Sequence, residues 1–123
     1  MKLSLNIEIP DERVSDLLCS ALEGGSTYWA RITATKHGRF VEWKFCHELP
    51  FTENGALIFS TLENDEINNR TCWELDRAAC HKGLQMMAEK YPHHFSCFLT
   101  ENDDAETGDV FLQCALFGEV VFG

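Results

Sequence analysis

Apolar and polar residues alternate strictly at the start of the chain. Single polar residues separate Leu3, Leu5, Ile7 and Ile9 from one another. Successive side chains of a β-strand point to opposite faces, so this spacing places the four apolar side chains on one face. The pattern predicts a half-buried strand over residues 3–9.

A helical period replaces this alternation after Pro10. Two acidic residues follow the proline and suit the first turn of a helix. Apolar residues then recur three and four positions apart, at Val14, Leu17, Leu18, Ala21 and Leu22. Gly24 and Gly25 provide a stop signal. The pattern predicts an amphipathic helix that ends at these glycines.

The middle of the chain is rich in aromatic and β-branched residues, which favour strands. Residues 28–35 and 39–45 are separated by His37-Gly38 and fit an antiparallel pair. Residues 56–62 follow an Asn-Gly turn signal and predict a further strand. With the N-terminal segment, the sheet is expected to have about four strands.

Helical signals dominate the second half, after a polar loop over residues 63–70. Thr71 and Glu74 have the spacing of a capping box, which predicts the start of a long helix that lasts to Tyr91. Pro92 interrupts this helix, and the apolar residues after it indicate a short second helix. The next expected helix caps are two aspartates, Asp103 and Asp104.

An acidic connector at residues 100–109 runs directly into an apolar block at residues 110–117. Carboxylates in a first turn complement the helix dipole, so residues 105–117 predict a helix that ends at Gly118. A strand is the alternative, because periodicity alone does not assign a short apolar run. Residues 119–122 are expected to be extended.

These elements predict a single α+β domain over residues 1–123, in which an antiparallel sheet of about four strands packs against three or four helices. Hydrophobic residues form 45% of the chain and charged residues 24%, which is globular rather than disordered composition. A chain of 123 residues also falls within the usual size of one domain. We therefore expect one core.

The net charge is −10, from twenty acidic and ten basic side chains. This charge argues against direct binding to nucleic acid, because the sequence has no cluster of Lys and Arg that could neutralise phosphates. It favours a partner with a basic surface. Solubility alone is the alternative explanation. No apolar run reaches membrane-spanning length and the start lacks the features of a signal peptide, so we expect a cytoplasmic protein with no membrane contact and reduced cysteines.

Cysteine and histidine lie close together at several places, and both are zinc ligands. His94 and Cys97 would share one face of a helix. No Cys-x-x-Cys pair accompanies them, and His47-Glu48 lacks the second histidine of a metalloprotease helix. We therefore expect no metal, no cofactor and no catalytic residue, with a zinc-dependent enzyme or ligand-binding protein as the alternative function.

Two groups of residues are candidates for binding a partner. The first is the set of carboxylates in the acidic connector, namely Glu101, Asp103, Asp104, Glu106 and Asp109. They form either a patch for a basic protein surface or a solvated helix start. The second is Tyr28 with Trp29, as interface anchors or as core residues.

Two parts of the chain carry distinctive motifs. Residues 16–29 include Ala-Leu-Glu-Gly-Gly and Tyr-Trp, and residues 87–95 with 102–119 include Asn-Asp-Asp-Ala-Glu-Thr-Gly-Asp-Val-Phe-Leu-Gln. Together they resemble a family of small bacteriophage and prophage proteins that has no assigned activity. The resemblance implies an accessory protein of the host bacterial cytoplasm. Such a protein would bind and inhibit a bacterial protein, as anti-CRISPR or anti-restriction inhibitors that mimic DNA do. Self-association as a homodimer is a further alternative.

Overall fold

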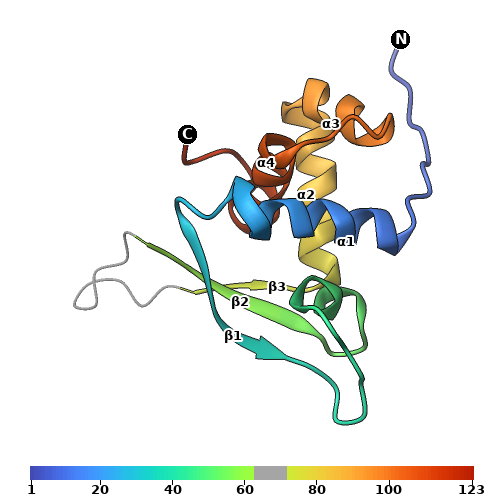
Figure 1. Cartoon of the computed structure of the whole chain (residues 1–123). Coiled ribbons are helices and arrows are strands. Elements are labelled where there is room, and N and C mark those ends of the chain that lie inside the picture. The colour runs from blue at the N-terminus through green and yellow to red at the C-terminus, as the bar shows by residue number, and fades with distance from the viewer. Residues whose placement is uncertain (63–71) are drawn as a thin grey trace.

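The computed structural model describes residues 1–62 and 72–123. Helices lie over one side of a small sheet, and the two ends of the chain lie on the helical side (Figure 1). In chain order the elements are α1 (Asp11–Ser20), the π-helical turn η1 (Ala21–Gly25), β1 (Ala30–Lys36), the 3-10 helix η2 (Cys46–Phe51), β2 (Ala56–Thr61), β3 (Trp73–Leu75), α2 (Arg77–Lys90), α3 (Pro92–Leu99) and α4 (Ala105–Phe117).

The sheet is antiparallel with the order β1-β2-β3, and the protein is therefore of the predicted α+β class. Ile32 of β1 is paired with Phe59 of β2, and Leu57 of β2 is paired with Leu75 of β3. Phe59, Leu57 and Leu75 are all buried. The central strand β2 thus contributes most of the sheet's share of the core, as its run of apolar residues predicts.

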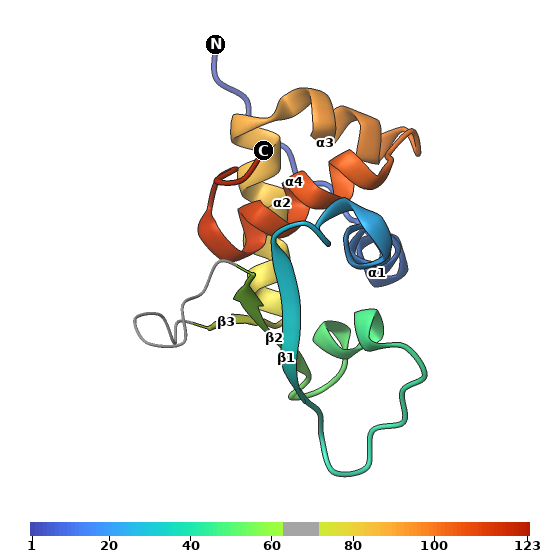
Figure 2. The same ribbon diagram turned by 60° about the vertical axis from the view of Figure 1, so that its left-hand side comes forward.

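Helix α4 is the centre of the hydrophobic core. Every residue from Thr107 to Leu116 is buried, so the helix is enclosed on all sides. It packs against α1, η1 and α2, and both views show it among the other helices (Figure 2). Its enclosure explains why the apolar residues of 105–117 show no simple period, because a fully buried helix has no polar face.

The predicted helix boundaries near α3 and α4 are confirmed. Pro92 occupies the first turn of α3, where its missing N–H costs nothing. Asp104 caps α4, and its carboxylate accepts a hydrogen bond of 3.0 Å from the backbone N–H of Thr107. Gly118 ends α4 with φ at 81°, a left-handed conformation that glycine adopts without strain.

Two predicted strands are wrong, and the described part of the sheet has three strands. Residues 3–9 are extended but unpaired, and the side chains of Leu3 and Leu5 are 75% and 76% exposed. Residues 39–45 form a loop in which Phe40 is 91% exposed. In the structure β1 pairs with β2 instead.

The predicted start of the long helix is also wrong. Glu74 lies in β3 and pairs with β2, whereas Thr71 and the predicted polar loop 63–70 lie outside the described residues. Helix α2 begins at Arg77, and the Asp76 carboxylate caps it by accepting a hydrogen bond of 2.8 Å from the N–H of Ala79. Asp76 is as good a cap as a threonine, and the strand pairing of residues 73–75 decides between them.

Gly83 allows the closest approach between α2 and α4. A Cβ atom at this position would lie 2.7 Å from the Cβ of Ala115. We expect Gly83→Ala to destabilise the fold by about 1–3 kcal/mol, because overpacking exceeds the gain in helix propensity. Denaturant unfolding measures the loss.

Gly24 is the matched control, since a Cβ atom there has no neighbour within 4 Å. Gly24→Ala should leave stability within about 0.5 kcal/mol of the parent. Equal stability of the two variants would show that α2 and α4 do not depend on this contact.

Candidate functional site

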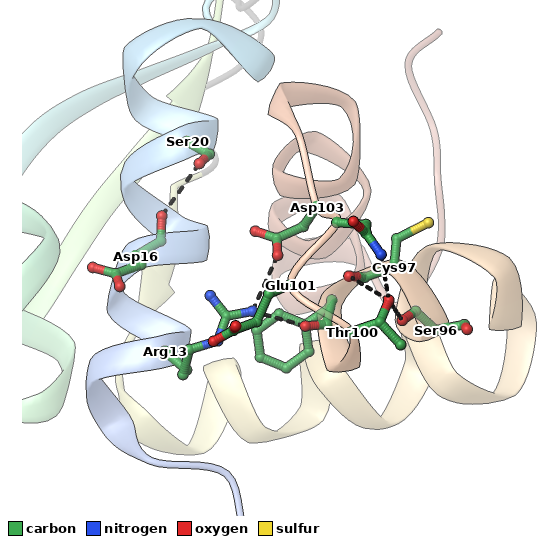
Figure 3. Close-up of polar contacts among 10 residues, drawn as sticks. Arg13, Asp16, Ser20, Ser96, Cys97, Thr100, Glu101 and Asp103 are labelled. Atoms are coloured by element: carbon green, nitrogen blue, oxygen red, sulfur yellow. Dashed lines mark hydrogen bonds and ion pairs between the residues drawn. The ribbon is translucent and has the colours of Figure 1, made fainter.

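Arg13 joins α1 to the turn between α3 and α4 (Figure 3). Its Nη2 donates a hydrogen bond of 3.0 Å to Asp103 and one of 2.7 Å to the carbonyl of Phe98. Its Nε lies 3.9 Å from the carboxylate of Glu101. Since the guanidinium also lies over the ring of Phe98, both its edge and its face are used. The Arg13 contacts therefore hold the turn against α1.

The two parts of the chain that Arg13 joins are rich in carboxylates. Residues 11–25 and 100–107 contain eight acidic side chains and one basic side chain, Arg13. The two ranges are in contact, because α1 and η1 pack against α4. We name as the acidic face the carboxylates of Glu12, Asp16, Glu23, Glu101, Asp103, Asp104 and Glu106. All of them are exposed except Asp103, which is partly buried.

The carboxylates of the acidic face differ in their contacts and in their exposure. Asp103 is bound by Arg13, and its side chain is only 11% exposed, whereas that of Glu101 is 77% exposed. Asp104 caps α4, and the hydrogen bond from the Thr107 backbone holds the pKa of its carboxyl below the usual value. Glu106 in the next turn is exposed. Glu101, Asp104 and Glu106 thus lie exposed at the surface.

Asp109, the last carboxylate of the acidic connector, lies inside the protein. It is 8% exposed and belongs to α4. Its Oδ1 accepts hydrogen bonds from Ser26 Oγ at 2.8 Å and from Trp29 Nε1 at 2.6 Å. Its Oδ2 accepts one from Tyr28 at 2.7 Å, and Gln113 Nε2 donates to Oδ1 at 3.2 Å. Four donors thus surround a carboxylate that forms no ion pair with a basic side chain of residues 1–62 and 72–123.

Gln113 extends this network to the end of the chain. Its side-chain oxygen accepts hydrogen bonds of 2.7 Å from the backbone N–H groups of Val121 and Phe122. The ring of Phe122 stacks on Trp29 with the ring centres 5.2 Å apart. Residues 119–122 form neither helix nor strand, and this segment lies over the buried polar groups.

The structure therefore divides the residues predicted to bind a partner. Trp29 is 2% exposed and Asp109 is buried beside it, so both are core residues. Tyr28 is 51% exposed, but its hydroxyl is bound to Asp109. Glu101, Asp103, Asp104 and Glu106 remain together at the surface. The helical geometry of α4 explains the split, because residue 109 lies on the inner side of the helix.

The histidines and cysteines do not gather into a metal site in the part of the chain that the structure describes. His94 Nδ1 is 3.0 Å from Thr107 Oγ1, which ties α3 to α4. Cys97 lies on α3 one turn from His93, with 3.9 Å between its sulfur and Nε2. The two residues named for zinc thus have other neighbours, and no third ligand joins them among residues 1–62 and 72–123.

Ser15 and His47 form a pair that the sequence does not predict, because 32 positions separate them. Ser15 Oγ lies 2.8 Å from His47 Nδ1 and 3.1 Å from the His47 carbonyl oxygen. A hydroxyl has one proton, and the carbonyl can only accept, so Nδ1–H donates to Oγ when the hydroxyl donates to the carbonyl. This arrangement fastens η2 to α1 and leaves no base for the serine. The pair is structural.

No described helix is both long enough and apolar enough to cross a membrane.

Comparison with protein-family models, with curated proteins and with solved structures gave no match to this chain.

The Asp109 network should contribute strongly to stability. Asp109→Asn places an NH₂ group among four donors, so at least one buried group loses its acceptor. We expect a loss of about 2–4 kcal/mol in the free energy of unfolding. The exposed Asp16→Asn is the control and should change stability by less than about 0.5 kcal/mol. A similar small effect for Asp109→Asn would contradict the network's role.

Tyr28 gives the network a dependence on alkaline pH. Burial, with the hydrogen bond to Asp109 as the next cause, raises the pKa of Tyr28 to about 12. A free tyrosine has a pKa of about 10. The folded state therefore holds the Tyr28 proton more tightly than the unfolded state does, and Tyr28 contributes to stability below pH about 10. This contribution is lost as the pH rises towards about 12.

Unfolding by denaturant between pH 9 and 12, with Tyr28→Phe as the reference, tests this expectation. The buried thiols of Cys80 and Cys114 have pKa values raised to about 12 and about 11, but they contribute equally in both proteins. The advantage of the parent over Tyr28→Phe should therefore shrink between pH about 10 and 12. A constant difference over this range would show that Tyr28 does not couple to folding.

Proposed function

We propose that this chain is a phage-encoded accessory protein that binds and inhibits a bacterial host protein through the acidic face. A component of a defence system of the CRISPR or restriction type, with a basic surface that normally contacts nucleic acid, has the complementary charge. The observation that carries the proposal is that α1 and η1 pack against α4, which brings together exposed carboxylates from two segments far apart in sequence that have Arg13 as their one basic residue. The resemblance of both ends of the chain to phage proteins supports the class of partner.

The rigidity of the acidic face is a second support. Arg13 holds the turn that carries Glu101 and Asp103, and Asp104 is fixed as the cap of α4. Carboxylates on a fixed frame lose less conformational entropy on binding than carboxylates on a mobile tail. A surface that imitates the regular charges of a nucleic-acid backbone requires such fixed positions.

The surplus of charge on this face is the third support. Arg13 pairs with Asp103 and, at 3.9 Å, with Glu101, so it makes no ion pair with the other carboxylates of the acidic face. Glu12, Asp16 and Glu106 form no ion pair with a basic side chain of the described residues. A basic partner surface would supply the missing counter-charges and would be attracted over several ångströms.

Capture from a bacterial lysate, followed by binding measurements with the purified partner, tests the proposal. The test variant carries Glu12→Gln, Asp16→Asn, Glu101→Gln and Glu106→Gln, and it leaves Asp103, the cap and the buried carboxylate intact. We expect it to weaken binding by about tenfold or more, because attraction between fixed charges is lost. Binding of the parent should also weaken between 50 and 300 mM salt.

The matched control neutralises four exposed carboxylates outside the acidic face, with Glu42→Gln, Glu53→Gln, Glu89→Gln and Glu119→Gln. Both variants have the same net charge, so only the position of the charge differs. Equal loss of affinity in the two variants would refute the acidic face as the binding surface. Binding that is independent of salt would refute recognition by charge.

A further inference from the structure

The first nine residues have the sequence of a strand but no strand to pair with. Leu3, Leu5 and Ile7 lie on one side of this extended segment and are 75%, 76% and 52% exposed. A groove of about 480 Å³ lies along the segment and is bordered by Ile7 on one side and by Leu84 of α2 on the other. The apolar side chains are therefore not packed into their own domain, although their alternation fits a sheet.

The sheet has an open edge of matching character. β1 is an edge strand, and its second edge pairs with no strand in the described chain. A groove of about 280 Å³ lies beside it, lined by Ala30 and Ile32 of β1, by Leu22 of η1 and by Cys46 of η2. An open edge that borders an apolar groove can accept a further strand, which supplies main-chain hydrogen bonds and fills the groove with alternate side chains.

We propose that residues 3–9 of one copy of this chain pair with the free edge of β1 in a second copy, so that two copies exchange their N-terminal strands. In an antiparallel register with Ile7 opposite Ile32, the side chain of Ile7 enters the groove that Ala30 and Ile32 line. Leu5 lies opposite Ala34, past the register irregularity between Ile32 and Ala34. Glu8 then lies opposite Arg31, on the other face of the sheet. Such a pair of opposite charges stabilises a strand pairing. Both segments are seven residues long, counting residues 3–9 against β1 (Ala30–Lys36).

The position of the two segments favours exchange between copies. In both views the N-terminal segment leaves α1 beside α2 and α3 and runs away from the sheet (Figure 1, Figure 2). The free edge of β1 lies on the sheet side of the molecule. A two-fold arrangement lets each copy give one strand and accept one, so the interface is closed and needs no other partner.

Charge variants of the full chain test this exchange by sedimentation velocity at 150 mM salt, over about 1–200 μM protein. We expect a dimer for the parent. Glu8→Arg alone and Arg31→Glu alone each place like charges opposite one another at both pairings and should raise the dimer dissociation constant by about tenfold or more. Mixing the two variants restores opposite charges at both pairings, so the mixture should dimerise like the parent.

This mixture separates exchange from pairing within one chain. Pairing within one chain would give a monomer at all concentrations, and mixing would have no effect; either result overturns the proposal. Ile7→Lys should also give a monomer, because it places a charge in the groove, while Asn6→Lys on the polar side should remain dimeric. Circular dichroism checks that each variant is folded. Because residues 6–8 are exposed, substitutions there should not disturb the fold. A dimer that persists in Ile7→Lys refutes the exchange.

Discussion

The buried carboxylate of Asp109 is the interaction on which the arrangement of this protein depends. An ionised carboxylate is costly to remove from water unless hydrogen bonds replace its hydration. Here Ser26, Tyr28, Trp29 and Gln113 provide four donors. Because three of them come from the turn before β1 and the fourth from α4, the carboxylate is stable only when these distant segments are assembled.

The consequences of this network reach the C-terminal end of the chain. Gln113 uses its amide to hold the carboxylate and its oxygen to hold the backbone of Val121 and Phe122. Phe122 in turn covers Trp29 by stacking. The same α4 that is fixed from within by Asp109 presents Glu106 on its outer side. One buried charge thus orients the helix start whose exposed charges form part of the acidic face.

The local signals of the C-terminal half determined its structure well. The Asp104 cap, Pro92 and Gly118 each act within a few residues, so the sequence predicts α3 and α4 correctly. The role of Asp109 is not predictable in this way. In a run of acidic residues, Glu106 and Asp109 have similar chemistry, and only the packing of α4 against α1 and η1 separates them. The donors Ser26, Tyr28 and Trp29 are about 80 positions away, and no local pattern connects them to α4.

The N-terminal segment shows a different limit of prediction from the sequence. Alternation at residues 3–9 correctly describes which side chains can be buried together, but it does not say where the complementary surface lies. Competition for pairing is decided across the whole sheet: β2 takes one edge of β1 and β3 takes the other edge of β2. In the described chain this leaves the outer edge of β1 open. A strand pattern without a strand partner therefore points to association with another surface. Exposing its leucines to water is unfavourable, and burial against a second surface would remove this unfavourable free energy.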